Sequence, residues 1–263
     1  MSHLEKALEK AKKQREVNHR QEVAGPTVSP PSPTYVHTRI IPIEERHLIK
    51  NRLATLSSHP IILDRYNLLR TQILQNTRDN GSNTILVTSV NKGEGKTLTA
   101  INLALSISRE LSHTVLLVDA DLKCPTIAKF FGLAIDKGLS DYLMYGIPLL
   151  ELLVNPGIGK LTILPGGKGI SHSTELLGSP RMAELVKEIK GRYPDRYIIF
   201  DSPPILSSAD TLVFSSYVDS ILLVVEAGKT SSEQIKEAMV LLKGKHVLGT
   251  VLNKAEIKEK DYY

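Results

Sequence analysis

The sequence predicts an α/β fold in which a mostly parallel β-sheet has helices on both faces. From residue 83 onward, short apolar runs alternate with longer amphipathic stretches. The apolar runs are continuous, which is typical of strands covered on both faces. Hydrophobic residues make up 41% of the chain and charged residues 23%, as in a soluble globular protein. These observations together favour a parallel sheet between two helical layers.

Each apolar run predicts one strand, and each amphipathic stretch predicts one helix. The expected strands are Thr84–Thr88, Val115–Val118, Leu161–Leu164, Tyr197–Phe200, Ser220–Val225 and Val247–Leu252. The expected helices are Pro60–Gln75, Thr97–Leu111, Arg181–Lys190 and Ser232–Lys243. Because ligands of such sheets bind at the carboxyl ends of the strands, we expect the functional residues at that edge.

The chain divides by composition into four parts. Residues 1–23 predict a charged helix with a narrow apolar stripe, which either docks on a partner or stays exposed to solvent. Residues 24–39 form a proline-rich linker, because repeated prolines favour an extended backbone. Residues 40–254 form the globular domain, and residues 255–263 form a short polar tail.

Composition also indicates which cellular compartment and which kinds of partner to expect. The single cysteine, Cys124, excludes an internal disulfide, and no apolar segment reaches the length of a membrane span. The amino-terminus lacks the apolar core of a secretory signal, so we expect a cytoplasmic protein. The net charge of +5 is spread along the chain, which argues against a nucleic-acid partner. The eight histidines show no metal-ligand spacing.

The segment Asn91–Thr97 has the residues of a phosphate-binding loop between a strand and a helix. Gly93 and Gly95 allow the backbone to curl, so that its N–H groups face inward. Lys96 adds a mobile positive charge, and the Thr97 hydroxyl is a ligand for magnesium. Val90 stands where the usual pattern has its first glycine. The plainer alternative is an ordinary turn with a surface lysine, and two acidic motifs argue against it.

Two later strands end in aspartates. Asp119 and Asp121 follow the strand at Val115–Val118, and alternation along an extended chain predicts that both face the same side. Asp201 follows the strand at Tyr197–Phe200 and precedes two prolines. A lone aspartate at a strand end is commonly a turn former. Its position downstream of a phosphate loop instead favours a carboxylate that supports magnesium.

The stretches GEGKT, LLVDADLK followed by Pro125, and IIFDSPP resemble the bacterial tyrosine kinases of capsule and exopolysaccharide synthesis. These kinases belong to the MinD/ParA group of P-loop ATPases, and the resemblance covers residues 60–253. It implies a P-loop NTPase fold, ATP and Mg²⁺ as cofactors, and transfer of phosphate from ATP to protein tyrosine.

The resemblance also assigns roles to residues of this chain. Lys96, Asp119, Asp121 and Asp201 are the implied catalytic residues, and Asp119 orients or deprotonates the acceptor tyrosine. Thr97, Asp121 and Asp201 are the implied metal site. The implied nucleotide contacts are Gly93, Glu94, Gly95, Lys96, Thr97 and Leu98, with Asn253 at the adenine.

The chain departs from the MinD and ParA signature in one place and from the kinase pattern in two. Asn91 occupies the position of the signature lysine of MinD and ParA proteins, which favours the kinase branch. The tail has only two tyrosines, Tyr262 and Tyr263, which we expect to accept phosphate between neighbouring subunits. The subunit-contact motif is weakened, since only Arg70 of its three positions is retained, with Asp64 and Asn67 at the other two.

The sequence therefore predicts a cytoplasmic protein-tyrosine autokinase that regulates exopolysaccharide or capsule polymerisation or export. The resemblance implies a homo-oligomer without a membrane span of its own. A membrane polysaccharide co-polymerase would activate it and recruit it to the inner face of the membrane. One alternative is a nucleotide-driven assembly switch without kinase activity, and another is a positioning ATPase like MinD or ParA.

Overall fold

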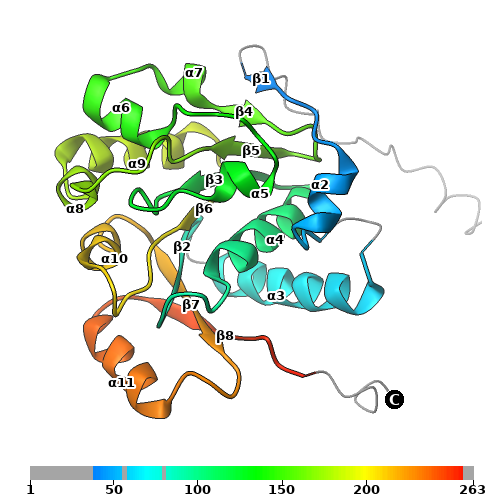
Figure 1. Ribbon diagram of the computed structural model, residues 1–263, viewed down its shortest axis with the longest axis vertical. Helices are drawn as coiled ribbons and strands as arrows, with labels where there is room; N and C mark the ends of the chain where they lie inside the picture. The colour runs from blue at the N-terminus through cyan, green and yellow to red at the C-terminus, as the bar shows by residue number, and fades with distance from the viewer. Residues whose placement is uncertain (1–37, 55–57, 79–80, 257–263) are drawn as a thin grey trace, which may run out of the picture. The chain divides into compact units, whose positions relative to one another are not determined.

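A central β-sheet organises the structure, a computed structural model that describes residues 38–54, 58–78 and 81–256. The chain divides into two units, residues 1–32 and 33–263, and every described residue lies in the second. The described strands are β1 (Arg39–Ile40), β2 (Thr84–Ser89), β3 (Thr114–Asp119), β4 (Val154–Asn155), β5 (Leu161–Leu164), β6 (Arg196–Asp201), β7 (Ser220–Glu226) and β8 (Val247–Asn253). They form one sheet in the order β1-β4-β5-β3-β6-β2-β7-β8 (Figure 1).

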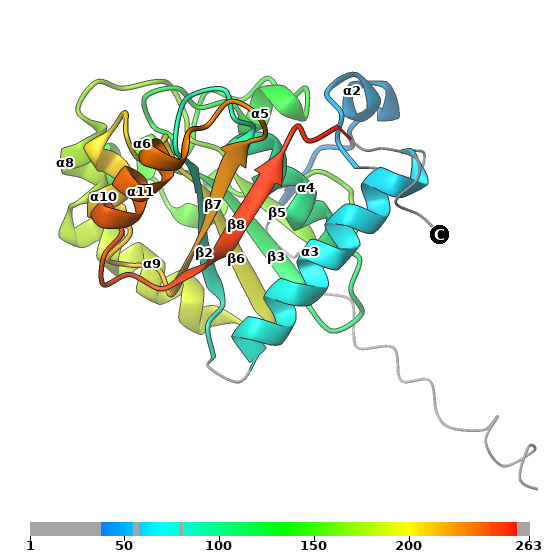
Figure 2. The same ribbon diagram turned by 90° about the horizontal axis from the view of Figure 1, so that it is seen from below.

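Helices cover both faces of this sheet. The described helices are α2 (Glu45–Lys50), α3 (Pro60–Arg78), α4 (Lys96–Ser108), α5 (Ile127–Phe130), α6 (Leu139–Tyr145), α7 (Leu149–Leu152), α8 (Ser173–Leu177), α9 (Pro180–Arg192), α10 (Ala209–Phe214) and α11 (Ser232–Leu241). Figure 2 shows α3 and α4 on one side of the sheet, with α9, α10 and α11 on the other. The predicted α/β fold is therefore confirmed.

The two faces of the sheet bury two separate apolar clusters. On the α4 side, Ile85 and Val87 of β2 pack with Ile101 and Leu105 of the helix. Alternate residues of the same strand point to the other face, where Leu86 joins side chains of α9 and α10. A strand buried on both faces needs apolar residues at successive positions, which explains the continuous runs in the sequence.

The predicted elements that fall within the described residues are all present, with some shifts at their ends. The largest shifts are at helix ends: α4 stops at Ser108 instead of Leu111, and α3 continues to Arg78 instead of stopping at Gln75. The short strands β1 and β4 and several short helices were not predicted. β4 runs antiparallel to β5, while the other strand pairs are parallel.

The strand register brings the functional motifs to one edge of the sheet. β6 lies between β2 and β3, and Asp201 pairs with Val87 on one side and with Asp119 on the other. The carboxyl ends of these three strands are therefore neighbours. This is the edge at which parallel α/β sheets bind ligands.

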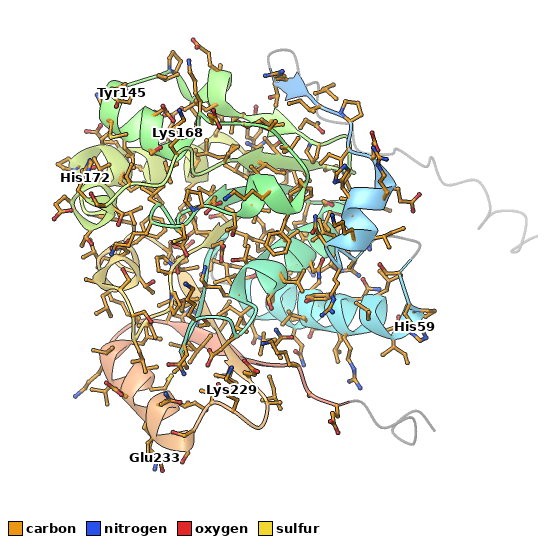
Figure 3. The ribbon with its side chains drawn as sticks, in the orientation of Figure 1. His59, Tyr145, Lys168, His172, Lys229 and Glu233 are labelled. Atoms are coloured by element: carbon orange, nitrogen blue, oxygen red, sulfur yellow. The ribbon has the colours of Figure 1, made fainter. Side chains whose placement is uncertain are left out.

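Several expectations concern parts of the chain away from this edge. The predicted helix at 1–23, nearly all of the proline-rich linker, and Tyr262 and Tyr263 lie outside the described residues. Among the helices that the structure describes, none is both long and apolar enough to cross a membrane. Two of the histidines, His59 and His172, lie at opposite edges of the view in Figure 3.

Candidate active site

The loop between β2 and α4 curls at two glycines. Gly93 and Gly95 have φ angles of +86° and +95°, in the left-handed region that favours glycine. Gly95 is the amino-terminal cap of α4 and has no side chain to fill the hydrogen-bonding positions there. The first backbone N–H groups of the helix therefore remain available at the positive end of its dipole. Such a loop is suited to binding phosphate groups.

Val90 has a structural reason for replacing the usual first glycine. Its side chain is fully buried in the apolar cluster opposite α4. Its backbone continues the sheet, since the Val90 N–H donates to the carbonyl of Val224 and its carbonyl accepts from the N–H of Leu206. Val90 therefore joins the start of the loop to the sheet. The turn itself is made by Gly93 and Gly95.

Lys96 lies at the centre of a cluster of opposite charges. Its Nζ is 2.9 Å from Asp121 Oδ2 and 3.5 Å from Asp201 Oδ1. The Thr97 hydroxyl donates to Asp201 Oδ2 at 2.6 Å. Burial alone would lower the pKa of Lys96, but the negative charges of Asp201 and Asp121 outweigh this effect and raise the pKa. Three distant segments of the sequence thus meet at one ammonium group.

Asp119 is more deeply enclosed than its neighbour Asp121. Its side chain caps the start of α5, with Oδ2 accepting hydrogen bonds from the backbone N–H groups of Thr126 at 2.8 Å and Ile127 at 2.9 Å. The other oxygen, Oδ1, is buried without a hydrogen-bond partner. Burial, together with the negative charge of Asp201, raises the pKa of Asp119 from 3.8 to about 8.

Asp119 and Asp121 lie on one side of the chain, as alternation predicts, because Val118, Ala120 and Leu122 join the apolar cluster on the other face of the sheet. β3 ends at Asp119, and the chain then turns, with the Cys124 N–H donating to the carbonyl and the side chain of Asp121. The two carboxylates nevertheless have different partners, since Asp119 caps α5 and Asp121 pairs with Lys96. Asp121 lines a cavity at the phosphate loop, and Asp119 lines a second cavity beside it.

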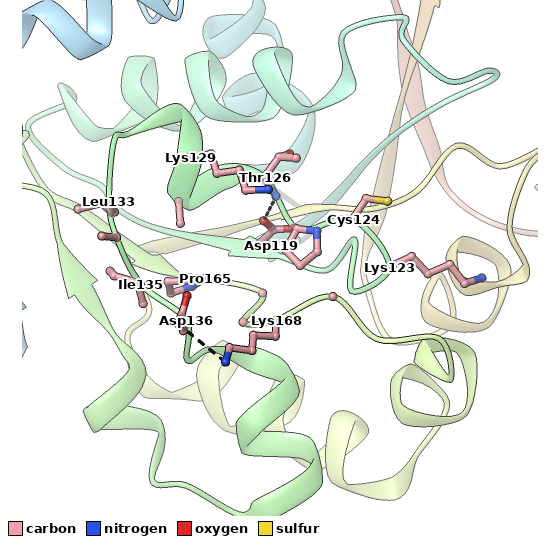
Figure 4. A pocket seen from close by; sticks show the side chains of 16 residues that line it. Asp119, Lys123, Cys124, Thr126, Lys129, Leu133, Ile135, Asp136, Pro165 and Lys168 are labelled. Atoms are coloured by element: carbon pink, nitrogen blue, oxygen red, sulfur yellow. Dashed lines mark hydrogen bonds and ion pairs between the residues drawn. The ribbon is translucent and has the colours of Figure 1, made fainter.

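The two cavities differ in what surrounds them. The first has a volume of about 400 Å³ and is bordered by the phosphate loop, including Lys92, Gly93, Gly95, Lys96, Thr97 and Leu98. The second, about 500 Å³, is bordered by Asp119, the α5 segment and the glycine-rich stretch 166–169 (Figure 4). In Figure 4, Lys129, Asp136 and Lys168 are placed around this second cavity. The site thus has space for two separate groups.

Glu94 and Asn253 connect the phosphate loop to the neighbouring strands. The Asn253 amide donates to the Glu94 carbonyl at 2.8 Å, and a Cβ at Gly95 would lie 2.1 Å from the same amide nitrogen. The Glu94 side chain is 3% exposed and accepts a hydrogen bond from the Thr230 hydroxyl at 2.6 Å. Asn253 also lines a third cavity, of about 560 Å³, between α3 and β8.

The oxygen atoms near Lys96 fit a hard divalent cation. Asp201 Oδ1 is buried and, apart from its ion pair with Lys96, has no hydrogen-bond partner, and the Thr97 hydroxyl is in contact with the other oxygen of the same carboxylate. Asp121 Oδ2 lies 2.9 Å from the ammonium of the same lysine. Oxygen ligands of this kind suit magnesium, which is commonly completed by substrate phosphates. The part of the chain that the structure describes has no cluster of three or more His, Cys, Asp or Glu residues arranged for a metal.

Two residues of the site were not assigned from the sequence. Thr230 follows β7 at the same edge of the sheet, and its position after a buried strand was the available signal. Lys123 follows the Asp119–Asp121 motif, and its ammonium lies 3.2 Å from Asp210 Oδ1 of α10. The distance of 87 positions between these two residues explains why the sequence did not suggest their contact.

Comparison with known proteins decides the family. Residues 82–247 match a family model described as an AAA domain. The tyrosine-protein kinase YwqD of Bacillus subtilis (strain 168) is 32% identical over 217 residues, which cover 81% of this chain and 90% of that protein. This chain belongs to the bacterial tyrosine kinase family. These kinases form part of the MinD/ParA group of P-loop ATPases.

Solved structures agree with this family. The kinase domain of VpsO is 30% identical, with a TM-score of 0.67 over 74% of this chain and 97% of that domain. The chimerical protein CapA2B2 is 25% identical, with a TM-score of 0.72 over 83% of this chain and 94% of that one. A bacterial tyrosine kinase has the P-loop ATPase fold, which implies binding of a nucleotide with a divalent metal.

Proposed function

We propose that this bacterial tyrosine kinase is an ATP-dependent protein-tyrosine autokinase that regulates exopolysaccharide or capsule polymerisation or export. The observation that carries the proposal is the meeting of Lys96, Thr97, Asp121 and Asp201 at one cavity, with Asp119 at the adjoining one. A phosphate donor and a phosphate acceptor need such neighbouring spaces.

The cavity at the phosphate loop holds the triphosphate of ATP. Lys96 binds the β- and γ-phosphates, and the backbone from Gly93 to Leu98 surrounds them, with Glu94 contributing through its backbone. Thr97, Asp121 and Asp201 hold Mg²⁺, which supplies charge neutralisation at the phosphates. Asn253 borders the cavity between α3 and β8, which we assign to the adenosine part of ATP.

The second cavity admits the acceptor tyrosine. Asp119 lines it, and the raised pKa makes its ionised carboxylate a stronger proton acceptor, so in that form it is suited to orient the phenol and to receive its proton. The acceptors are Tyr262 and Tyr263 of a neighbouring copy of the chain. A tyrosine hydroxyl has a pKa near 10 in water, so a positioned proton acceptor assists the transfer.

The kinase acts in the cytoplasm and binds a membrane polysaccharide co-polymerase, which recruits it to the inner face of the membrane. Residues 1–34 are the segment that we assign to this recruitment, because their composition predicts a helix and a proline-rich tether. Unchanged membrane recruitment of a chain that lacks residues 1–34 would refute that assignment.

Incubation with Mg²⁺ and ATP, followed by intact mass measurement, tests the kinase activity. We expect phosphate additions that map to Tyr262 and Tyr263 and that disappear in Lys96→Met and in Asp119→Ala. Absence of phosphotyrosine, even with the cytoplasmic segment of the co-polymerase present, would contradict the proposal.

A nucleotide-driven assembly switch is the second candidate. The observation that favours it is the use of Arg70 inside the chain, where its guanidinium bonds Ser106 and Glu110 of the same molecule. ATP turnover without phosphotyrosine would support the switch over the kinase.

A further inference from the structure

Lys123 lies on the boundary between the two cavities of the site. The cavity at the phosphate loop and the cavity beside Asp119 share three lining residues, Lys123, Cys124 and Thr126. Of these three, Lys123 has the charged side chain. Any group that passes from a donor in the first cavity to an acceptor in the second passes this boundary.

The ammonium group of Lys123 is held in place by α10. Its Nζ lies 3.0 Å from the Ser208 hydroxyl and 3.2 Å from Asp210 Oδ1. Asp210 is completely buried, and the hydroxyl groups of Ser173 and Thr174 also donate to it. The position of the anion is therefore fixed by packing and by hydrogen bonds, and it fixes the cation in turn.

The Lys123 side chain lines both cavities and is not enclosed by this pair. The Lys123 side chain is 40% exposed, whereas its partner Asp210 is fully enclosed. An ammonium group has three N–H donors, and two contacts, to Ser208 and Asp210, account for two of them. One N–H donor is therefore not used by these two contacts.

A second Lys–Asp pair of this chain provides a structural comparison. Lys190 of α9 pairs with Asp219, and both are half-buried, with side-chain exposures of 38% and 20%. Neither residue lines the phosphate-loop cavity or the Asp119 cavity. The position at both cavities, rather than the ion pair itself, is what distinguishes Lys123.

We propose that Lys123 is a catalytic residue of the phosphoryl transfer, with its ammonium contacting the group in transit. The inference rests on the proposed kinase function. The bond between the γ-phosphorus and the β-phosphate oxygen breaks, and its electron pair leaves with ADP. The phenolic oxygen bonds the phosphorus, and its proton passes to Asp119 and then to water. Lys123 neutralises the charge on the three outer oxygens during this transfer, as a cationic finger does in related chemistry.

Four variants test the proposal on the full chain with Mg²⁺ and ATP. Lys123→Gln keeps a hydrogen-bond donor for Asp210 but removes the charge, and we expect kcat to fall about 100-fold. Lys123→Arg keeps the charge and most of the turnover. The paired variant Lys123→Met with Asp210→Asn removes both charges, so thermal stability recovers while kcat stays low. Lys190→Met is the control that keeps wild-type kcat.

Three readouts separate a catalytic role from a structural one. Phosphotyrosine formation and ADP release give kcat, calorimetry gives the affinity for ADP, and thermal unfolding gives stability. We expect the affinity for ADP to stay near that of the wild type in Lys123→Gln, because ADP lacks the transferred group. Wild-type kcat in Lys123→Gln, or recovery of kcat in the paired variant, overturns the proposal.

The same measurements distinguish failure of this inference from failure of the proposed function. If the wild type releases ADP but forms no phosphotyrosine, the kinase function fails. The role of Lys123 is then tested by the kcat of ATP hydrolysis in the same variants, because the same charge develops when water is the acceptor. If the wild type turns over no ATP at all, both proposals are overturned.

Discussion

At the scale of single residues, Asp119 makes the free energy of unfolding depend on pH. Its pKa is raised from 3.8 to about 8, first by burial and then by the charge of Asp201. Between these values the folded protein binds a proton that the unfolded chain releases. The contribution of Asp119 to the free energy of unfolding is therefore full below a pH of about 4 and is lost as the pH rises through about 8.

Asp119→Asn should flatten this pH dependence. Without nucleotide, we expect the free energy of unfolding of the wild type to fall from pH 5 to pH 8, and that of the variant to fall less, because the amide does not ionise. Urea titration at both pH values measures the difference. Asp64→Asn, at an exposed position of α3, serves as the control. The same slope in the wild type and in Asp119→Asn would contradict the assignment.

Residue contacts were partly predictable from the sequence. The order of the three motifs was enough to bring Lys96, Asp121 and Asp201 to one edge of the sheet. The hydrogen-bond partners of Asp119 were not predictable, because they belong to the start of the short helix α5. The partner of Lys123 lies on α10, and local spacing gives no information on such a contact.

At the scale of elements, the turn between β7 and α11 is fastened to the phosphate loop. The Thr230 hydroxyl donates to the buried Glu94 carboxylate and accepts from the N–H of Glu226. The Gln234 amide of α11 also reaches Asn91 Oδ1 at 3.5 Å. These contacts couple the conformation of the loop to the position of α11.

Thr230→Val should weaken this connection. The variant removes a donor from the buried Glu94 carboxylate, so we expect the free energy of unfolding to fall by about 1–3 kcal/mol. We also expect weaker ADP binding, because the loop loses a support. Urea unfolding and ADP titration measure both effects. Thr71→Val is the matched control, since the hydroxyl of Thr71 bonds the helix backbone at an exposed position. Equal effects of the two variants would argue against the coupling.

The predicted elements differ from the missed ones in length and burial. β2, β3 and β6 have six residues each and are buried on both faces, so their apolar runs stand out. β1 and β4 have two residues each, which is too short for any periodic pattern. Short helices such as α5 depend on tertiary contacts, as with the Asp119 side chain at its start. Local sequence contains little of that information.

At the scale of the whole molecule, the contacts of Arg70 affect how copies of the chain can assemble. Its guanidinium donates to the Ser106 carbonyl at 3.1 Å and pairs with Glu110 at 3.0 Å, which fastens α3 to α4. The retained residue of the predicted contact motif is thus engaged within its own chain. A subunit contact through α3 would therefore use exposed positions such as Asp64.

Mixing two variants should reveal transfer between copies of the chain. Lys96→Met lacks the phosphate-binding ammonium but retains Tyr262 and Tyr263. A chain with both tyrosines changed to phenylalanine retains the catalytic residues but lacks these acceptors. We expect phosphate to appear on the Lys96→Met chain only in the mixture, and intact mass resolves the two species. Phosphate on neither species would exclude transfer between copies.

The predicted catalytic residues lie at the carboxyl ends of the strands. The opposite edge of the sheet can therefore be modified without contacting them. The turn before β8 lies at that opposite edge, and a Cβ at Gly244 would meet no atom within 4 Å. A fluorescent reporter inserted there would leave turnover intact. It would allow the kinase to be followed in living cells without touching either terminus.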